Sequence, residues 1–300
     1  MIKNIEIKIF LISIIIMTGI SLIFENIFYK NFQNQFLLFL IPLIWPGLAH
    51  GSLDIQIAQR AKIITNNREL SVFLCLYIFL AFIFFLFWQR YPEFSFAIFL
   101  LLSIYHFGES DSTLALKKNL SFLEIFARGS LIIGIPTIIY FNDVSTIFKY
   151  LNISENFSEI IYFLSIIMIS LSIFLILIII RKITNFKNIK NSFLFEIFLI
   201  TFCFIYFEPL IAFSIYFCFL HSIRHLLREQ KYFRITFAEL FYKTIPITLI
   251  TFIFLISIFI FLDLNTIDFK YLSLTFISLS CLTVPHMILV NRVKKINVLK

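Results

Sequence analysis

The chain has 300 residues, of which 60% are hydrophobic and only 14% are charged, and its mean hydropathy is +0.97. This composition excludes an ordinary soluble domain and predicts a protein whose solvent is the lipid bilayer. The formal net charge of +8 does not indicate nucleic-acid binding, because the basic residues are scattered through short loops with no stripe and no interleaved aromatic residues.

Ten hydrophobic segments follow one another along the chain, and each is a candidate membrane-spanning helix. Their approximate spans are 9–24, 34–54, 70–88, 93–108, 120–141, 159–180, 193–207, 210–227, 244–262 and 270–290. Glu208 and Pro209 alone separate the seventh from the eighth, which predicts a tight turn. The longest polar stretches, 142–158 and 181–192, are predicted as loops. We therefore predict an all-α, polytopic membrane helix bundle, with residues 1–300 forming a single domain.

The first apolar segment, 9–24, follows two lysines and has the length of a signal peptide. Glu25 and Asn26 follow it in place of an A-x-A cleavage site, so we expect it to remain as a helix. The cysteines are far apart in apolar segments and form no C-x-x-C motif, so we interpret them as small buried hydrophobic residues. They are Cys75, Cys203, Cys218 and Cys281.

Loop charges predict how this bundle is oriented. With ten helices, 19 Lys and Arg residues lie on one side of the membrane and four on the other, the four being Lys30, Arg90, Lys149 and Lys270. Cytoplasmic loops carry the excess of basic residues in membrane proteins. We therefore expect both termini in the cytoplasm and a multi-pass protein of the cell inner (plasma) membrane.

All five histidines of the chain fall late in even-numbered segments. His50 lies in the second segment, His106 in the fourth, His221 and His225 in the eighth, and His286 in the tenth. These ends are on the predicted cytoplasmic side, so the five imidazoles are expected at one depth in the bilayer. Ionisable side chains are costly in hydrocarbon and are usually functional there. The pattern predicts one metal site.

The spacing of His221 and His225 places both imidazoles on one helix face, one turn apart, where both are able to bind one ion. His286 follows Pro285, which kinks a helix and frees a carbonyl. His286 has three alternative roles: it is a fifth metal ligand, it supports the other ligands, or it is an ordinary core histidine. We favour a role without direct binding, because the other four histidines already supply four ligands.

Glycines and carboxylates surround two of these histidines. Gly47 and Gly51 flank His50 and permit close helix approach. Asp54 is positioned either to accept a hydrogen bond from a ligand imidazole or to cap the helix end. Four residues thus form a compact motif whose chemistry suits a supported metal ligand.

Two carboxylates also follow His106 closely. Glu109 and Asp111 either support the metal ligands or are solvated loop charges. Arg224 lies between His221 and His225 in sequence but on another face of the helix. We expect it to pair with Asp54 or Asp111, or to reach the cytoplasmic interface.

Histidine ligation suits iron, copper, zinc or nickel, and the lack of a cysteine motif argues against structural zinc. Four neutral imidazoles leave positions open for a small oxidant, which favours redox chemistry. Haem b would need facing histidine pairs, and di-iron desaturases carry H-x-x-H-H boxes that this chain lacks. A transporter or proton channel with a histidine relay is the main alternative; a non-catalytic membrane partner is another. Against transport, discontinuous helices and intramembrane carboxylates are scarce, Glu124 and Glu196 being the exceptions.

With these motifs the chain resembles the Brp/Blh family of bacterial beta-carotene dioxygenases. The resemblance rests on four motifs in family order, from about residue 45 to residue 290. They are His50-Gly51-Ser52-Leu53-Asp54, His106-Phe107-Gly108 with Asp111, His221-x-x-Arg224-His225, and Pro285-His286. The first motif departs mildly from the family pattern, in which Pro is common at Ala49 and Ala at Ser52; neither change removes a metal donor.

The resemblance implies an Fe(II) enzyme that splits all-trans-beta-carotene at its central 15,15' double bond with O2, giving two all-trans-retinals. Retinal would supply a microbial rhodopsin, which is the implied functional partner. The implied iron ligands are His50, His106, His221 and His225.

A substrate tunnel is expected beside these ligands. Its candidate lining residues, for which plain helix packing is the alternative, are Tyr105, Phe107, Tyr216 and Phe217. Beta-carotene is about as long as the hydrocarbon core is thick, roughly 30 Å. We therefore expect a tilted or in-plane tunnel, reached laterally between helices from the lipid.

Overall fold

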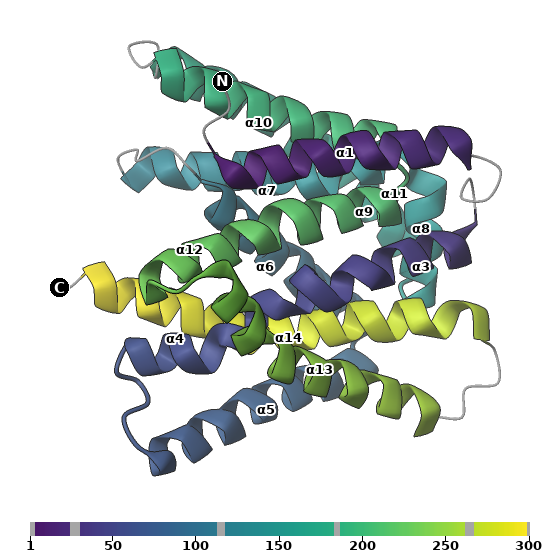
Figure 1. The fold of residues 1–300 in the computed structure, drawn as a ribbon. Helices are drawn as coiled ribbons and strands as arrows, with labels where there is room; N and C mark the ends of the chain where they lie inside the picture. The colour runs from purple at the N-terminus through teal and green to yellow at the C-terminus, as the bar shows by residue number, and fades with distance from the viewer. Residues whose placement is uncertain (1–3, 25–30, 113–117, 183–186, 262–266, 299–300) are drawn as a thin grey trace.

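The computed structural model describes residues 4–24, 31–112, 118–182, 187–261 and 267–298. Helices account for nearly all of these residues, and no strand is found among them. Within these described ranges, eight helices are long and apolar enough to cross a membrane. They run side by side through the bundle, and α1 begins at the end where α14 finishes (Figure 1). The predicted all-α membrane bundle is thereby confirmed.

The helical elements have the following bounds in chain order: α1 (Ile5–Ile23), α3 (Phe32–Pro42), η1 (Leu43–Gly47), η2 (Leu48–Leu53), α4 (Asp54–Arg60), α5 (Asn67–Arg90), α6 (Pro92–Asp111), α7 (Lys118–Ile139), α8 (Phe141–Tyr150), α9 (Glu155–Lys182), α10 (Lys187–Tyr206), α11 (Pro209–Tyr216), η3 (Phe217–Ser222), α12 (Ile223–Phe233), α13 (Phe237–Phe261) and α14 (Ile267–Val298). η1 and η3 are π-helices, and η2 is a 3-10 helix.

Each of the ten predicted spans falls on helix, but two differ from the other eight. The span 93–108 falls on α6, which is not among the eight helices that meet the length and hydropathy expected of a membrane crossing. The span 193–207 falls on α10, whose apolar part, Asn191–Tyr206, is shorter than a full crossing. The turn predicted at Glu208 is confirmed, because α10 ends just before it and α11 begins just after it.

The polar stretches predicted as loops are partly helical, which corrects the sequence reading. The stretch 142–158 contains most of α8 and the start of α9. α8 buries Val144, Ile147 and Phe148 and leaves its polar residues on the other face. Such an amphipathic helix is too short and too polar to register as an apolar segment. In the second stretch, α10 already begins at Lys187, and residues 183–186 lie outside the described residues.

The cysteines are free, as expected, but not all are buried. Cys203, Cys218 and Cys281 lie in the interior, whereas Cys75 is exposed on α5. In a membrane protein an exposed apolar side chain contacts lipid rather than water, so the exposure of Cys75 costs little.

Two spans are irregular where they carry histidines. In the span Phe32–Arg60, Trp45 has extended backbone angles (φ −146°, ψ 124°) within η1, and His50 follows in η2. In the span Pro209–Phe233, the π-helix η3 carries His221 before regular helix resumes in α12. π-turns inside α-helices are frequent at functional sites. Discontinuous helices were expected to be scarce, and the break at Trp45 makes Phe32–Arg60 an exception.

Close backbone contact joins α6 to α7. A Cβ atom on Gly108 would lie 1.9 Å from the carbonyl oxygen of Ile125, and one on Gly129 would lie 1.9 Å from that of Ile104. Each glycine thus lets the other helix's backbone approach, as small residues do between membrane helices. Since His106 lies two residues before Gly108, this contact fixes the height of its imidazole in the bundle.

Candidate metal centre

All five histidine rings converge in the interior of the bundle, from η2, α6, η3, α12 and α14. The ring centroids of His106 and His221 are 4.9 Å apart, those of His50 and His221 5.4 Å, and those of His50 and His286 5.2 Å. His225 joins the group at 5.7 Å from His50 and 5.6 Å from His286. Residues more than two hundred positions apart in sequence therefore meet in one cluster.

Three of these histidines approach each other most closely. His50, His106 and His221 each offer a ring nitrogen, and the three nitrogens lie within 4.8 Å of one another. Two imidazole nitrogens bound to one ion at about 2.1 Å are at most about 4.2 Å apart. Small side-chain rotations would bring the three rings to a shared ion.

The hydrogen bonding of the cluster fits a bound metal. Among the described residues, both ring nitrogens of His221, Nδ1 of His225 and Nε2 of His286 are buried without a hydrogen-bond partner. An unsatisfied buried polar atom costs about 1–3 kcal/mol. Four such nitrogens in one cluster are difficult to explain if the histidines serve only to pack the interior. A divalent ion, which takes the single lone pair of a neutral imidazole, would satisfy one nitrogen of each ring that it binds.

Two of the rings are held by hydrogen bonds on the other nitrogen. Nδ1 of His50 lies 2.5 Å from the carbonyl oxygen of Gly47, to which it donates. Nδ1 of His286 lies 2.9 Å from both carboxylate oxygens of Asp54, and Tyr77 donates to the same carboxylate at 2.9 Å. In each ring the lone pair is then on Nε2. This is how metal-bound histidines are usually oriented, and Asp54 holds His286 rather than capping a helix.

The two glycines beside His50 differ in role. A Cβ on Gly47 would lie 3.2 Å from the carbonyl oxygen of Pro42 and 3.3 Å from Sγ of Cys218, so this glycine does allow close packing. Around Gly51 nothing lies within 4 Å, and the residue lines a cavity instead. The expectation of close helix approach at Gly51 was wrong, because the 3-10 turn directs it to the cavity.

An apolar cavity of about 350 Å³ adjoins the cluster, with His50, His106 and His286 on its wall. Of the aromatic residues expected to line a tunnel, Phe107 and Phe217 contribute to the wall. The other two are held elsewhere by their hydroxyl groups.

Those two are the tyrosines, and neither lines the cavity. The hydroxyl of Tyr105 donates a hydrogen bond to Glu109 at 3.2 Å, and that of Tyr216 donates to Asp111 at 2.8 Å. Glu109 also pairs with exposed Lys294 at 2.8 Å, so it is a charge at the bundle's edge rather than a support for the histidines.

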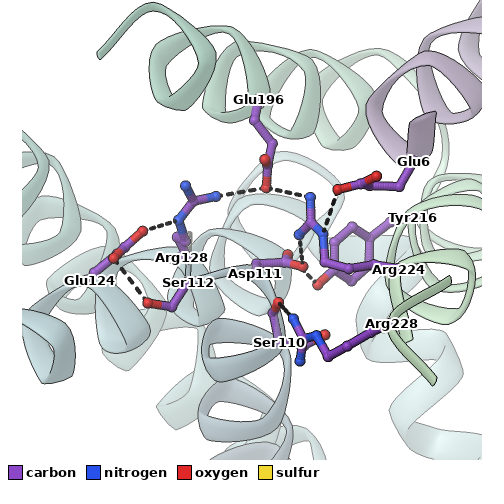
Figure 2. A network of polar contacts seen from close by, with 10 residues as sticks. All are labelled: Glu6, Ser110, Asp111, Ser112, Glu124, Arg128, Glu196, Tyr216, Arg224 and Arg228. Carbon is purple, nitrogen blue, oxygen red and sulfur yellow. Dashed lines mark hydrogen bonds and ion pairs between the residues drawn. The ribbon is translucent and has the colours of Figure 1, made fainter. Parts of the chain in front are cut away.

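A buried network of charged residues adjoins the histidines through Arg224, which pairs with Asp111 and, at 3.0 Å, with Glu196 (Figure 2). Glu196 also pairs with Arg128 at 2.8 Å, and Arg128 with Glu124 at 3.0 Å. Of the alternatives expected for Arg224, pairing with Asp111 is the one observed. The sequence indicated Glu124 and Glu196 only as carboxylates within apolar segments, and their pairing with Arg128 was not predicted.

Comparison with known proteins identifies related chains. A family model described as beta-carotene 15,15'-dioxygenase matches residues 41–294, a range that contains all five histidines. The beta-carotene 15,15'-dioxygenase of an uncultured marine bacterium, 66A03, is 32% identical over 254 residues, which cover 83% of this chain and 90% of that protein. No solved structure matches the chain.

Proposed function

Because the chain belongs to the beta-carotene 15,15'-dioxygenase family, we propose that it cleaves all-trans-beta-carotene at its central double bond with O2, giving two all-trans-retinals. The observation that carries the proposal is the cluster of five histidines, in which several buried ring nitrogens have no hydrogen-bond partner and three members line an apolar cavity. The cluster suits a redox metal, and the cavity suits a hydrocarbon.

The ligands of this centre are His50, His106, His221 and His225, and the metal is Fe(II). Bound iron supplies the redox chemistry by which O2 is activated for cleavage of the double bond. Three of the four rings already lie within a few ångströms of a shared position. The fourth, His225, is buried with Nδ1 free to bind, one turn beyond His221.

The neighbouring residues hold the imidazoles of the cluster in place, including that of His286. The carbonyl of Gly47 accepts from Nδ1 of His50, and Asp54 accepts from Nδ1 of His286. The pairing of Arg224 with Asp111 joins the helix that carries His221 and His225 to the helix that carries His106. These groups would hold the imidazoles of the cluster in position before a metal binds.

The cavity positions the substrate by shape. Apart from the histidines and Asp54, its wall is formed mainly by aliphatic and aromatic side chains, including Phe107 and Phe217. Such a wall excludes water and gives little electrostatic help to an apolar polyene. The bond that is cleaved must therefore be selected by its placement beside the histidines.

The chain is a multi-pass membrane protein. Which membrane it occupies, and in which orientation, is part of the proposal. The inner (plasma) membrane, with both termini in the cytoplasm, agrees with the loop charges. Beta-carotene dissolves in the same lipid. The retinal formed would be consumed by a retinal-binding rhodopsin of that membrane.

Expression in cells that accumulate beta-carotene tests the function. Cells with the wild-type chain should lose their orange colour and form retinal, and the purified protein should carry iron near one atom per chain. His221→Ala should keep the colour and lose the iron. A matched control is Phe254→Ala, which truncates an exposed side chain away from the site. Retained colour with the wild-type chain, or protein that binds no iron, would overturn the proposal and favour a histidine relay.

A further inference from the structure

The cavity beside the histidines reaches the outer surface of the bundle between α5 and α13. Its wall includes Leu74 and Ile78 from α5, and Ile250 and Thr251 from α13. Ile78 is 66% exposed and Ile250 is 67% exposed. A side chain that both lines a cavity and faces the outside marks the place where that cavity opens.

We propose that these four residues border a portal through which an apolar polyene passes from the bilayer to the histidines. The inference rests on the proposed function, which it deepens by assigning the route of the substrate. The portal residues are Leu74, Ile78, Ile250 and Thr251 throughout.

The position of the portal along its helices places it within the hydrocarbon. Leu74 lies seven residues after the start of α5, about 10 Å along the axis, and Ile250 lies 13 residues after the start of α13, about 20 Å along it. Because the hydrocarbon core is roughly 30 Å thick, both points are well inside it. The portal therefore opens to lipid tails and not to water.

The chemistry of the portal selects the same class of molecule. Three of its side chains are aliphatic, and the fourth is a threonine, so none carries a charge. A charged or strongly polar solute would have to leave water to reach it, at high cost. A long hydrocarbon already dissolved in the bilayer meets no such barrier.

The two helices that border the portal are the most peripheral of the candidate spans. In the most apolar stretch of α5 only 6% of residues are buried, and in α13 only 17%, against 83% for Pro209–Phe233. Both lie together along one edge of the bundle, opposite α10 (Figure 1). α14 forms the back wall of the cavity through Leu279, Leu282 and Thr283. Small outward movements of α5 or α13 would widen the opening without disturbing the interior.

A second cavity lies next to the first. It has a volume of about 100 Å³ and shares Phe99, Ser103, Phe107 and Phe213 with the first. Central cleavage requires a substrate that extends on both sides of the reacting bond. A polyene that passed the portal would carry its leading half toward this second cavity and leave its trailing half near α5 and α13.

Bulky substitutions at the portal test the route. Ile78→Trp and Ile250→Trp should each raise KM for beta-carotene in vesicles several-fold, with a larger rise in the double variant. Iron per chain and the thermal midpoint should match the wild type. Under anaerobic conditions the variants should also extract less beta-carotene from loaded vesicles. The matched controls are Leu76→Trp and Ile253→Trp, at positions 56% and 60% exposed on the same helices but off the cavity wall.

The outcomes separate the portal from the proposed function. If the wild-type protein neither cleaves nor extracts beta-carotene, the proposed function itself is overturned. Wild-type cleavage with equal uptake by portal and control variants would overturn the portal and leave the function standing. If a tryptophan variant does not fold, Ile78→Ala and Ile250→Ala test the portal in the opposite direction. Because these changes widen the portal, uptake should be faster than in the wild type at a low concentration of beta-carotene.

Discussion

Asp54 and His286 form a direct carboxylate–imidazole pair, with Nδ1 of the ring 2.9 Å from both carboxylate oxygens. The Tyr77 hydroxyl donates to the same carboxylate, so Asp54 itself is held in place. The pair fixes His286 with its Nε2 lone pair unsatisfied and buried. His286 is thereby better prepared to bind or support a metal than its position after Pro285 indicated.

Asp54→Asn should weaken iron binding about 10–100-fold, because an amide can present its N–H to the ring and disturb the tautomer that the carboxylate enforces. Titration of iron-free protein with Fe(II) would measure this. Asp143→Asn makes the same change on α8, away from the cluster, and should leave iron affinity as it is in the wild type. Equal affinity in the two variants would show that Asp54 does not act on the metal.

Arg224→Met should destabilise the protein by about 3–5 kcal/mol, because it removes one partner of a buried ion pair and leaves Asp111 and Glu196 without it. Thermal unfolding in detergent measures the loss, and iron content should fall as well. Lys294→Met breaks the exposed pair with Glu109 and should cost at most about 1 kcal/mol.

The double variant Arg224→Met with Asp111→Asn provides a further check on this pairing. Removing the carboxylate's charge together with the guanidinium should recover part of the stability lost in Arg224→Met. Strict additivity of the two changes would argue that Arg224 acts elsewhere.

Gly108→Ala should lower stability and iron content together. The added methyl group would overlap the Ile125 carbonyl and force α6 away from α7, which displaces His106. Overpacking of this kind costs about 1–3 kcal/mol or more. Gly19→Ala is the control, since nothing lies within 4 Å of its Cβ position and a helical Gly-to-Ala change is favourable by up to about 1 kcal/mol. Normal iron content in Gly108→Ala would contradict the role of this contact.

Metal removal should destabilise the wild-type protein reversibly. A ligand present at a hundred times its Kd stabilises the folded state by about 2.7 kcal/mol, so an Fe(II) chelator should lower the thermal midpoint and added Fe(II) should restore it. His221→Ala, which lacks a central ligand, should respond to neither. A chelator-dependent shift of equal size in His221→Ala would place the stabilising metal away from the histidines.

The convergence of the histidines could be predicted from sequence because depth in a membrane follows from position within an apolar segment. Loop charges then indicate which ends share a side. Those two regularities bring His50, His106 and His286 to one level, and the structure brings their rings together.

Their partners could not be predicted in the same way. Asp54 and His286 are 232 residues apart, and their contact depends on how α4 packs against α14. Arg128 and Glu196, 68 residues apart, likewise depend on how α7 meets α10. Hydropathy gives depth but not the rotation of a helix about its own axis. The helix α8 was missed for a different reason, since its apolar face is too narrow to raise the average over a window.

The network of Arg128, Arg224 and their carboxylates also constrains how the chain is made. Asp111 on α6 is synthesised 113 residues before Arg224 on α12. A lone carboxylate in hydrocarbon is costly, so α6 cannot settle in the bilayer as an isolated helix while it waits. Helices α6, α7 and α10 are expected to stay together, at the insertion machinery or packed against one another, until α12 has been synthesised. Insertion of these helices is therefore expected to be collective, and the charged network is complete only after Arg224 has been synthesised.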